Sequence, residues 1–214
     1  MKKKDIKIFF NAIKNRELET VQELLNGNKE YLTTCNFAPP KKDDGQSGLQ
    51  VAFKTANFKI AELLIVQGAD VNFIEQSEIN EWRAPVLHDC IRAVIFNCRT
   101  MQKNTDVFDF AFSLLNEMLK KGANPNAFDS YGNSCLGRAI LDARQMIDHP
   151  FFEGETSWAG ERLTDEERNI ALNQIRSVFK SLIDAGAVPD FFDSRRESAK
   201  DSIKNSKLEK HNLF

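Results

Sequence analysis

The chain has 214 residues, of which 42% are hydrophobic and 28% are charged, a composition typical of a soluble globular protein with a substantial core. Its formal net charge of -2 provides no field that would attract nucleic acid or an anionic membrane. No segment approaches the roughly 20 consecutive apolar residues of a membrane helix. We therefore expect neither nucleic acid nor a membrane as a partner.

The N-terminal segment and the cysteines predict a cytoplasmic protein. The start, MKKKDIKIFF, has the basic residues of a signal peptide, but Lys7 interrupts its apolar run. Four cysteines, Cys35, Cys90, Cys98 and Cys135, stand in apolar contexts without paired spacing, which indicates reduced core thiols. The Lys-, Asn- and Phe-rich composition is compatible with a bacterial cytoplasm.

The first part of the chain predicts two pairs of helices. Residues 9–25, FFNAIKNRELETVQELL, show the apolar pattern of two consecutive helices. A turn-rich insert, FAPPKKDDGQSG, follows at 37–48. A short helix then begins after Ser47, which suits a helix N-cap. A second helix, IAELLIVQ at 60–67, ends at Gly68, where glycine suits the left-handed C-terminal cap.

The second part predicts longer helices. LHDCIRAVIFNCRTMQ (87–102) and VFDFAFSLLNEMLKK (107–121) are apolar at helical spacing over long stretches. CLGRAILDARQMI (135–147) predicts one helix, and the segment after it is an irregular loop broken by proline and glycines. The next helix begins at Thr164, because Glu167 completes a capping box.

Three related segments mark an internal repeat. LLIVQGADVNF (63–73), MLKKGANPNAF (118–128) and LIDAGAVPDFF (182–192) each combine an apolar helix end, Gly-Ala, and an Asn or Asp. One helix pair cannot bury its own apolar face, so such units stack. The pattern resembles the ankyrin repeat family, most closely in GQSGLQVAFKTANFKIAELLIVQGADVN (45–72) and through Pro85 and His88 of APVLHDC.

The resemblance implies an all-α, ankyrin-like helical repeat solenoid of about four to five units, with short turn fingers and one long inserted loop. The Gly-Ala marks lie 54 and 64 positions apart, against about 33 in the family, so lengthened helices and inserted loops are expected. We predict one domain over 1–214. Its units are roughly 5–37, 43–73, 82–128 and 129–192, with a terminal cap at 193–214.

Catalytic and metal-binding patterns are weak in this sequence. His88 occupies the repeat's own Thr-Pro-Leu-His position, where a structural hydrogen bond is expected rather than a metal ligand. We predict no enzyme, no cofactor and no metal. The alternative is a small metal-dependent hydrolase at the 149–162 insert, which would need His149 to converge with Glu153, Glu155 or Glu161.

Aromatic residues follow the helix ends, where ankyrin-like proteins extend their fingers. Phe73, Phe128, Phe191 and Phe192 either stack finger on finger or present their rings to a partner. In the finger at 73–85, Trp82 either binds a partner or covers the long helices behind it.

The resemblance favours a monomeric, non-enzymatic module that binds a protein partner through its concave face and turn fingers, as an inhibitor or immunity-type protein in the narrower version. A structural subunit is a third possibility, although the highly charged terminal cap argues against open-ended stacking. The predicted partner-binding residues are Glu78, Trp82, Arg83, Tyr131, Asn133, Trp158 and Arg195.

Overall fold

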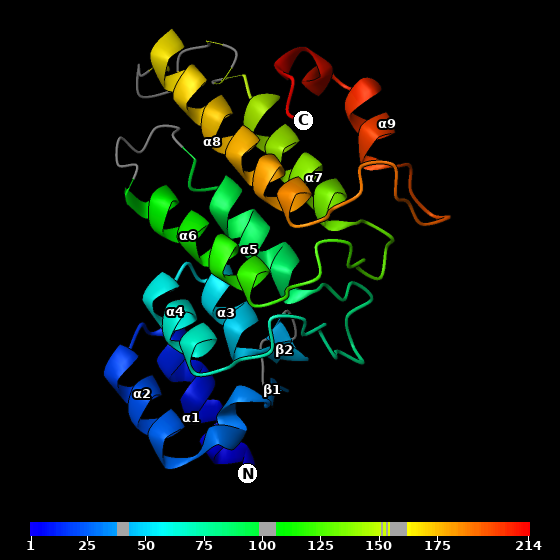
Figure 1. Cartoon of the computed structure of the whole chain (residues 1–214). Coiled ribbons are helices and arrows are strands. Elements are labelled where there is room, and N and C mark those ends of the chain that lie inside the picture. The colour runs from blue at the N-terminus through cyan, green and yellow to red at the C-terminus, as the bar shows by residue number, and fades with distance from the viewer. Residues whose placement is uncertain (38–42, 99–105, 151, 153, 155–161) are drawn as a thin grey trace.

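The computed structural model describes residues 1–37, 43–98, 106–150, 152, 154 and 162–214 (Figure 1). Its elements are α1 (Lys3–Lys14), α2 (Leu18–Gly27), η1 (Lys29–Leu32), β1 (Cys35–Asn36), β2 (Gln46–Ser47), α3 (Gly48–Lys54), α4 (Phe58–Val66), α5 (Val86–Ile95), α6 (Asp106–Lys120), α7 (Cys135–Ile147), α8 (Asp165–Asp184), α9 (Ala199–Lys204) and η3 (Lys207–His211).

The helices form two rows that run from the N-terminus to the C-terminus (Figure 1). The inner row is α1, α3, α5, α7 and α9, and each of its helices contacts the next. The outer row is α2, α4, α6 and α8, again in contact from one helix to the next. The loops that leave the outer helices extend to one side as fingers before the next inner helix begins. The ankyrin-like, mostly helical solenoid expected from the sequence is confirmed.

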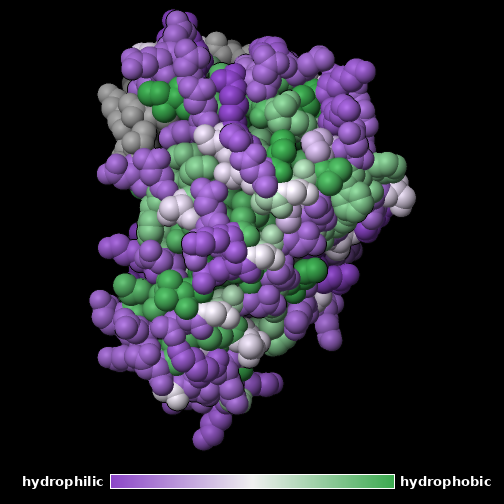
Figure 2. All heavy atoms as spheres, in the orientation of Figure 1, coloured by the Kyte–Doolittle hydropathy of each residue, from purple (hydrophilic) through white to green (hydrophobic). Residues whose placement is uncertain are grey.

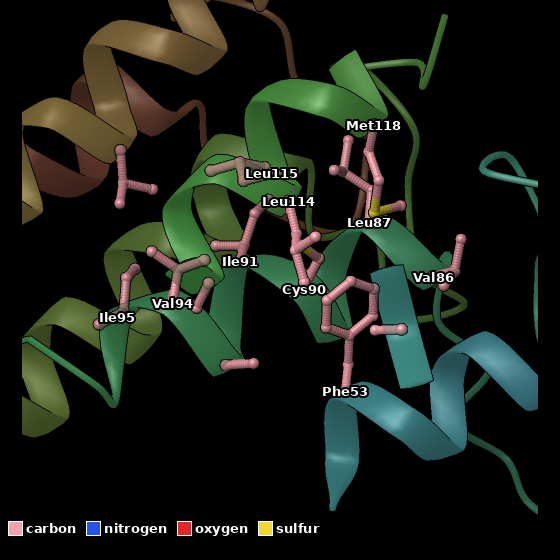
Figure 3. Packing of buried hydrophobic residues seen from close by; sticks show 14 of the residues in the cluster. Phe53, Val86, Leu87, Cys90, Ile91, Val94, Ile95, Leu114, Leu115 and Met118 are labelled. Atoms are coloured by element: carbon pink, nitrogen blue, oxygen red, sulfur yellow. The ribbon is translucent and has the colours of Figure 1, made fainter. Parts of the chain in front are cut away.

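The core lies between the two rows and continues through the stack as one hydrophobic cluster. At its centre Leu87 and Ile91 of α5 face Leu114, Leu115 and Met118 of α6 (Figure 3). All five side chains are almost fully buried, and each such burial stabilises the fold by roughly 1.5–3 kcal/mol.

The expected lengthening of the second half is confirmed for three helices and wrong for one. Helices α6, α7 and α8 have 15, 13 and 20 residues, and α8 begins at the capping box of Thr164 and Glu167. By contrast α5 ends at Ile95, although its apolar pattern predicted a helix that continues to 102. The Asn97 amide donates to Ala93 O at 2.7 Å and so takes a carbonyl that a continuing helix would use.

The Gly-Ala marks end the outer helices as expected. Gly68, Gly122 and Gly186 have φ of +93°, +89° and +98°, the left-handed region that favours glycine. Ser47 and Ser134 cap the helices that follow them, each accepting a hydrogen bond from a backbone N–H three residues later.

The asparagines that follow Gly-Ala join each turn to the next. The Asn72 amide donates to Gly122 O at 2.9 Å and its oxygen accepts from the Asn124 N–H at 2.7 Å. Asn126 repeats both bonds with Gly186 O at 2.8 Å and the Val188 N–H at 2.9 Å. The asparagine therefore holds neighbouring units together rather than only closing its own turn.

Candidate functional site

The fingers are the segments that precede the inner helices, and three of them are closed by paired backbone. The first contains the β1–β2 pair, in which Cys35 is opposite Ser47. The second finger, residues 73–86, is closed by a bridge between Ile74 and Pro85, and the third, residues 127–134, by a bridge between Phe128 and Ser134. The fourth finger spans residues 190–198 and leads into α9.

The second finger is bound to the third through Glu81, Trp82 and Arg83, and the Ser130 hydroxyl donates to Glu81 O at 2.7 Å. The Trp82 indole Nε1–H donates to Asp129 Oδ2 at 2.9 Å. Beside it the backbone N–H of Arg83 donates to Ser130 Oγ at 2.9 Å, and the Ser130 N–H donates back to Arg83 O at 3.0 Å. Trp82 thus contributes to the packing of the fingers, and only part of its side chain is exposed.

The third finger is bound to the fourth by different residues. Arg195 Nη1 donates to Ser130 O at 2.6 Å, and Arg196 Nε donates to Tyr131 O at 3.2 Å. The rings of Phe128 and Phe191 lie 5.0 Å apart between centroids. The finger-on-finger interpretation of the aligned aromatics is confirmed for this pair.

Asp129 organises the third finger from inside. Its carboxylate accepts hydrogen bonds from the backbone N–H groups of Tyr131 and Asn133, from the Asn133 amide and from Trp82. Burial alone would raise the pKa of Asp129, but the hydrogen bonds from Asn133 and Trp82 hold it below its ordinary value. The finger therefore contains a carboxylate that stays ionised.

Buried charges lie at the base of the second finger. Lys54 Nζ is 3.5 Å from Glu75 Oε2 and 3.7 Å from Asp89 Oδ1, and it lies 5.5 Å from the centroid of the Trp82 ring. Gln50 Nε2 also donates to Asp89 at 2.9 Å. Burial raises the pKa of Asp89 to about 6 and also raises the pKa of Glu75, against the opposing effect of Lys54 on both.

His88 has the structural role expected from its position in the repeat. It is buried in α5, and its Nε2 lies 3.3 Å from Ala127 O at the start of the third finger. Burial lowers its pKa to about 4, so the imidazole is neutral at physiological pH. It links an inner helix to a finger.

Five of the predicted partner-binding residues come together in this finger row: Trp82, Arg83, Tyr131, Asn133 and Arg195. Arg83, Tyr131 and Arg195 are exposed, whereas Asn133 is buried and its amide is used by Asp129. Glu78 is exposed on the second finger. Trp158 lies outside the described residues.

Sequence reasoning missed Asp129, Ser130 and Arg196, which join the fingers. The spacing of Asp129 and Asn133 around Gly132 was the available signal, because such a side chain commonly caps its own turn. The partners of Ser130 and Arg196 are 47 to 65 positions away in the sequence, so no local pattern indicates them.

A groove of about 420 Å³ opens between the third finger, the fourth finger and α7. Its apolar lining includes Phe128, Ile140, Leu141, Phe191 and Phe192. Its charged lining is Arg144, Arg195, Arg196 and Glu197. Figure 2 shows hydrophobic residues at the surface on this finger side of the molecule.

The alternative site at the insert is only partly described. Glu153, Glu155 and Glu161 lie outside the described residues, so their position relative to His149 is not part of the structure. In the described part of the chain, no group of three His, Cys, Asp or Glu side chains is placed to hold a metal ion. Across the same residues, no helix combines the length and apolar character that a bilayer crossing requires.

No protein-family model and no curated protein sequence matches the chain. Among solved structures, it is similar to an ankyrin repeat domain from Acinetobacter baumannii AYE, with 17% sequence identity and a TM-score of 0.44. The alignment covers 95% of this chain and 93% of that chain. The ankyrin-like fold described above is defined by this chain's own helix rows, turns and fingers.

Proposed function

We propose that the chain is a non-enzymatic protein-interaction module, a single-domain monomer that works in the cytoplasm and binds a protein partner with its fingers and concave face. The observation that supports this most is the row formed by the second, third and fourth fingers, which are hydrogen-bonded to one another. Each finger is fixed to the next through backbone atoms, while Arg83, Tyr131 and Phe192 remain exposed.

Rigid fingers with exposed arginine and aromatic side chains suit protein recognition. Aromatic and arginine residues are enriched among those that dominate interface energetics. Because the fingers are already fixed by hydrogen bonds, binding would cost little conformational entropy. The side chain of Arg83 has no hydrogen-bond or ion-pair partner within the described ranges, so it is available to a second protein.

Affinity capture from an extract of the source organism, read by mass spectrometry, tests this proposal. The variant is Arg83→Ala with Tyr131→Ala, which removes two exposed finger side chains and leaves the backbone network in place. Its matched control is Lys121→Ala with Val66→Ala, an exposed cation and an exposed apolar residue outside the fingers. Circular dichroism establishes that both variants are folded.

We expect a protein that the native chain and the control capture and the finger variant loses. Equal capture by the finger variant would contradict the proposed surface, and capture of no specific protein by the native chain would contradict the function. An inhibitory or immunity role is the narrower form of this proposal. It predicts that the activity of the captured protein falls when the native chain is added.

A further inference from the structure

The groove between the third and fourth fingers is a recess in which aromatic and aliphatic side chains lie among polar and charged ones. Phe128 and Phe191 stand together on the finger side, and Leu141 of α7 borders the opposite side. Phe192 and Leu141 are 61% and 36% exposed, so apolar surface is open to solvent here. Exposed apolar surface of this kind, bordered by polar groups, is typical of interaction sites.

The fourth finger is hydrogen-bonded to the third through Arg195 and Arg196, and an ion pair inside the fourth finger orients Arg195. Asp193 receives two hydrogen bonds from the Arg195 guanidinium, at 2.6 and 2.9 Å. The Asp193 carboxylate packs so closely on Gly132 that a Cβ there would lie 2.8 Å from Oδ1. Gly132 has φ of +82°, so this position requires glycine both for its conformation and for the close approach.

The charged side chains at the rim of the groove are three arginines and one glutamate, so positive charge is in excess there. Arg196 donates one hydrogen bond, to Tyr131 O, and within the described ranges no carboxylate lies at ion-pair distance from it. Arg144 Nε forms an i,i+4 ion pair with Asp148 Oδ2 at 3.6 Å, and the Arg144 side chain is 50% exposed. Glu197, the one acid in the lining, already accepts from Ser202 at 2.8 Å and Asn205 at 3.2 Å.

We propose that this groove binds a segment of the partner protein that inserts a large apolar side chain directly beside a carboxylate. The aromatic and aliphatic lining would bury the apolar side chain. The guanidinium groups of Arg144 and Arg196 would donate to the carboxylate, a charge-assisted pairing stronger than a neutral hydrogen bond. This inference rests on the proposed function, since it specifies the partner chemistry of the same finger surface.

Selection from a random linear peptide library displayed on phage, with the intact chain as bait, tests the inference. We expect the enriched peptides to share Asp or Glu within a few positions of Phe, Trp, Leu or Ile. Arg144→Gln with Arg196→Gln, and separately Phe192→Ala, should weaken these peptides by about tenfold or more. Lys121→Gln with Lys180→Gln is the control with the same charge change, and it should leave their affinity unchanged.

Peptides without the paired acid and apolar residue would overturn the inference. So would full affinity for both groove variants, or the absence of any enriched peptide. The groove variants also enter the capture experiment described above. A partner lost with Arg83→Ala and Tyr131→Ala but retained by the groove variants would leave the proposed function standing and exclude the groove.

Discussion

The Gly-Ala turns and the fingers connect the same helices, yet they join neighbouring units by different chemistry. In the turns one arrangement is used twice, because Asn72 and Asn126 make the same pair of bonds to the next Gly-Ala segment. In the fingers each junction is unique: Trp82 meets Asp129 at one, and Arg195 meets Ser130 at the next.

The difference shows that the turns and the fingers of this solenoid have separate roles. The repeated turns depend on residues with no ionisable side chain, and they set a regular spacing between units. The fingers depend on buried carboxylates and on partners far away in the sequence, so each finger can differ from its neighbours. Regular stacking and an individual surface are thereby produced by separate segments.

The largest expected effect is at the finger junction. Asp129→Ala would leave the Trp82 indole N–H, the Asn133 amide and two backbone N–H groups without their acceptor. We expect the free energy of unfolding to fall by about 4 kcal/mol, measured by urea denaturation followed by circular dichroism. Asp129→Asn keeps one oxygen and should lose less. A loss for Asp129→Ala no larger than that of a turn variant would contradict the central role of this carboxylate.

The second prediction concerns the pH dependence of stability. It distinguishes the buried carboxylates at the base of the second finger, which titrate, from the Gly-Ala turns, which do not. The pKa of Asp89 is about 6 in the folded chain against an ordinary value of 3.8, so the folded state binds this proton more tightly. The free energy of unfolding should therefore rise by roughly 3 kcal/mol through Asp89 as the pH falls from about 6 to about 4. Asp89→Asn should remove this contribution, as shown by urea denaturation at several pH values.

Other groups define the limits of that pH experiment. The pKa values of Glu75 and Asp142 are also raised by burial, so they act in the same direction as Asp89. His88 acts in the opposite direction, because its pKa is lowered to about 4 and the folded state therefore loses stability as the pH falls from about 6.5 to about 4. The Asp89 contribution is thus the difference between the profiles of the native chain and Asp89→Asn. Asp129 has a lowered pKa, and its contribution is lost only at still lower pH. Asn126→Ala removes no ionisable group, so this variant should keep the full pH dependence of the native chain. An identical pH profile for the native chain and Asp89→Asn would refute the prediction.

The third prediction concerns the turns themselves. Asn72→Ala and Asn126→Ala each remove two hydrogen bonds between neighbouring units at exposed positions. We expect each to lower the free energy of unfolding by about 2 kcal/mol, with similar values because the chemistry is the same. Thermal and urea denaturation of the two variants side by side provide the measurement. Clearly different losses would show that the two turns are not equivalent.

The smallest expected effect is a gain in stability at the joint between α3 and α4. There a left-handed position is occupied by alanine, whereas the Gly-Ala turns have glycine at theirs. Ala56 has φ of +53°, and Arg16 has φ of +65° in the equivalent α1–α2 joint, although left-handed residues are usually glycine. Ala56→Gly should raise the free energy of unfolding by about 0.5–1 kcal/mol, because relief of strain exceeds the entropy cost of glycine. A loss of stability in urea denaturation would show that the Ala56 methyl group contributes packing.

Local patterns predicted much of the fold. The capping box at Thr164 and Glu167, the glycines of the Gly-Ala turns and the length of α6 all depend on interactions within a few residues, which a sequence displays directly. The end of α5 was mispredicted because an apolar pattern continues past Ile95, while the Asn97 amide competes for the helix carbonyl there.

The candidate site was predicted only in outline. Trp82, Arg83, Tyr131 and Arg195 were found through their place in the repeat, and the structure brings them into one row. The Asn133 amide is used inside its own finger by Asp129, a local contact that the spacing of the two residues could have indicated. That Arg144 and Phe192 border one groove depends on contacts between separate units. Such contacts exist only after the helices have stacked.

The sequence by itself determined that paired helices stack through Gly-Ala turns, because helix periodicity and caps are set by neighbouring residues. The tertiary structure alone decided which finger residues face solvent, where Lys54, Glu75 and Asp89 meet, and where arginines and aromatic rings line one groove. These features join residues many positions apart, and their burial and pKa values follow from the packed neighbours rather than from the local chain.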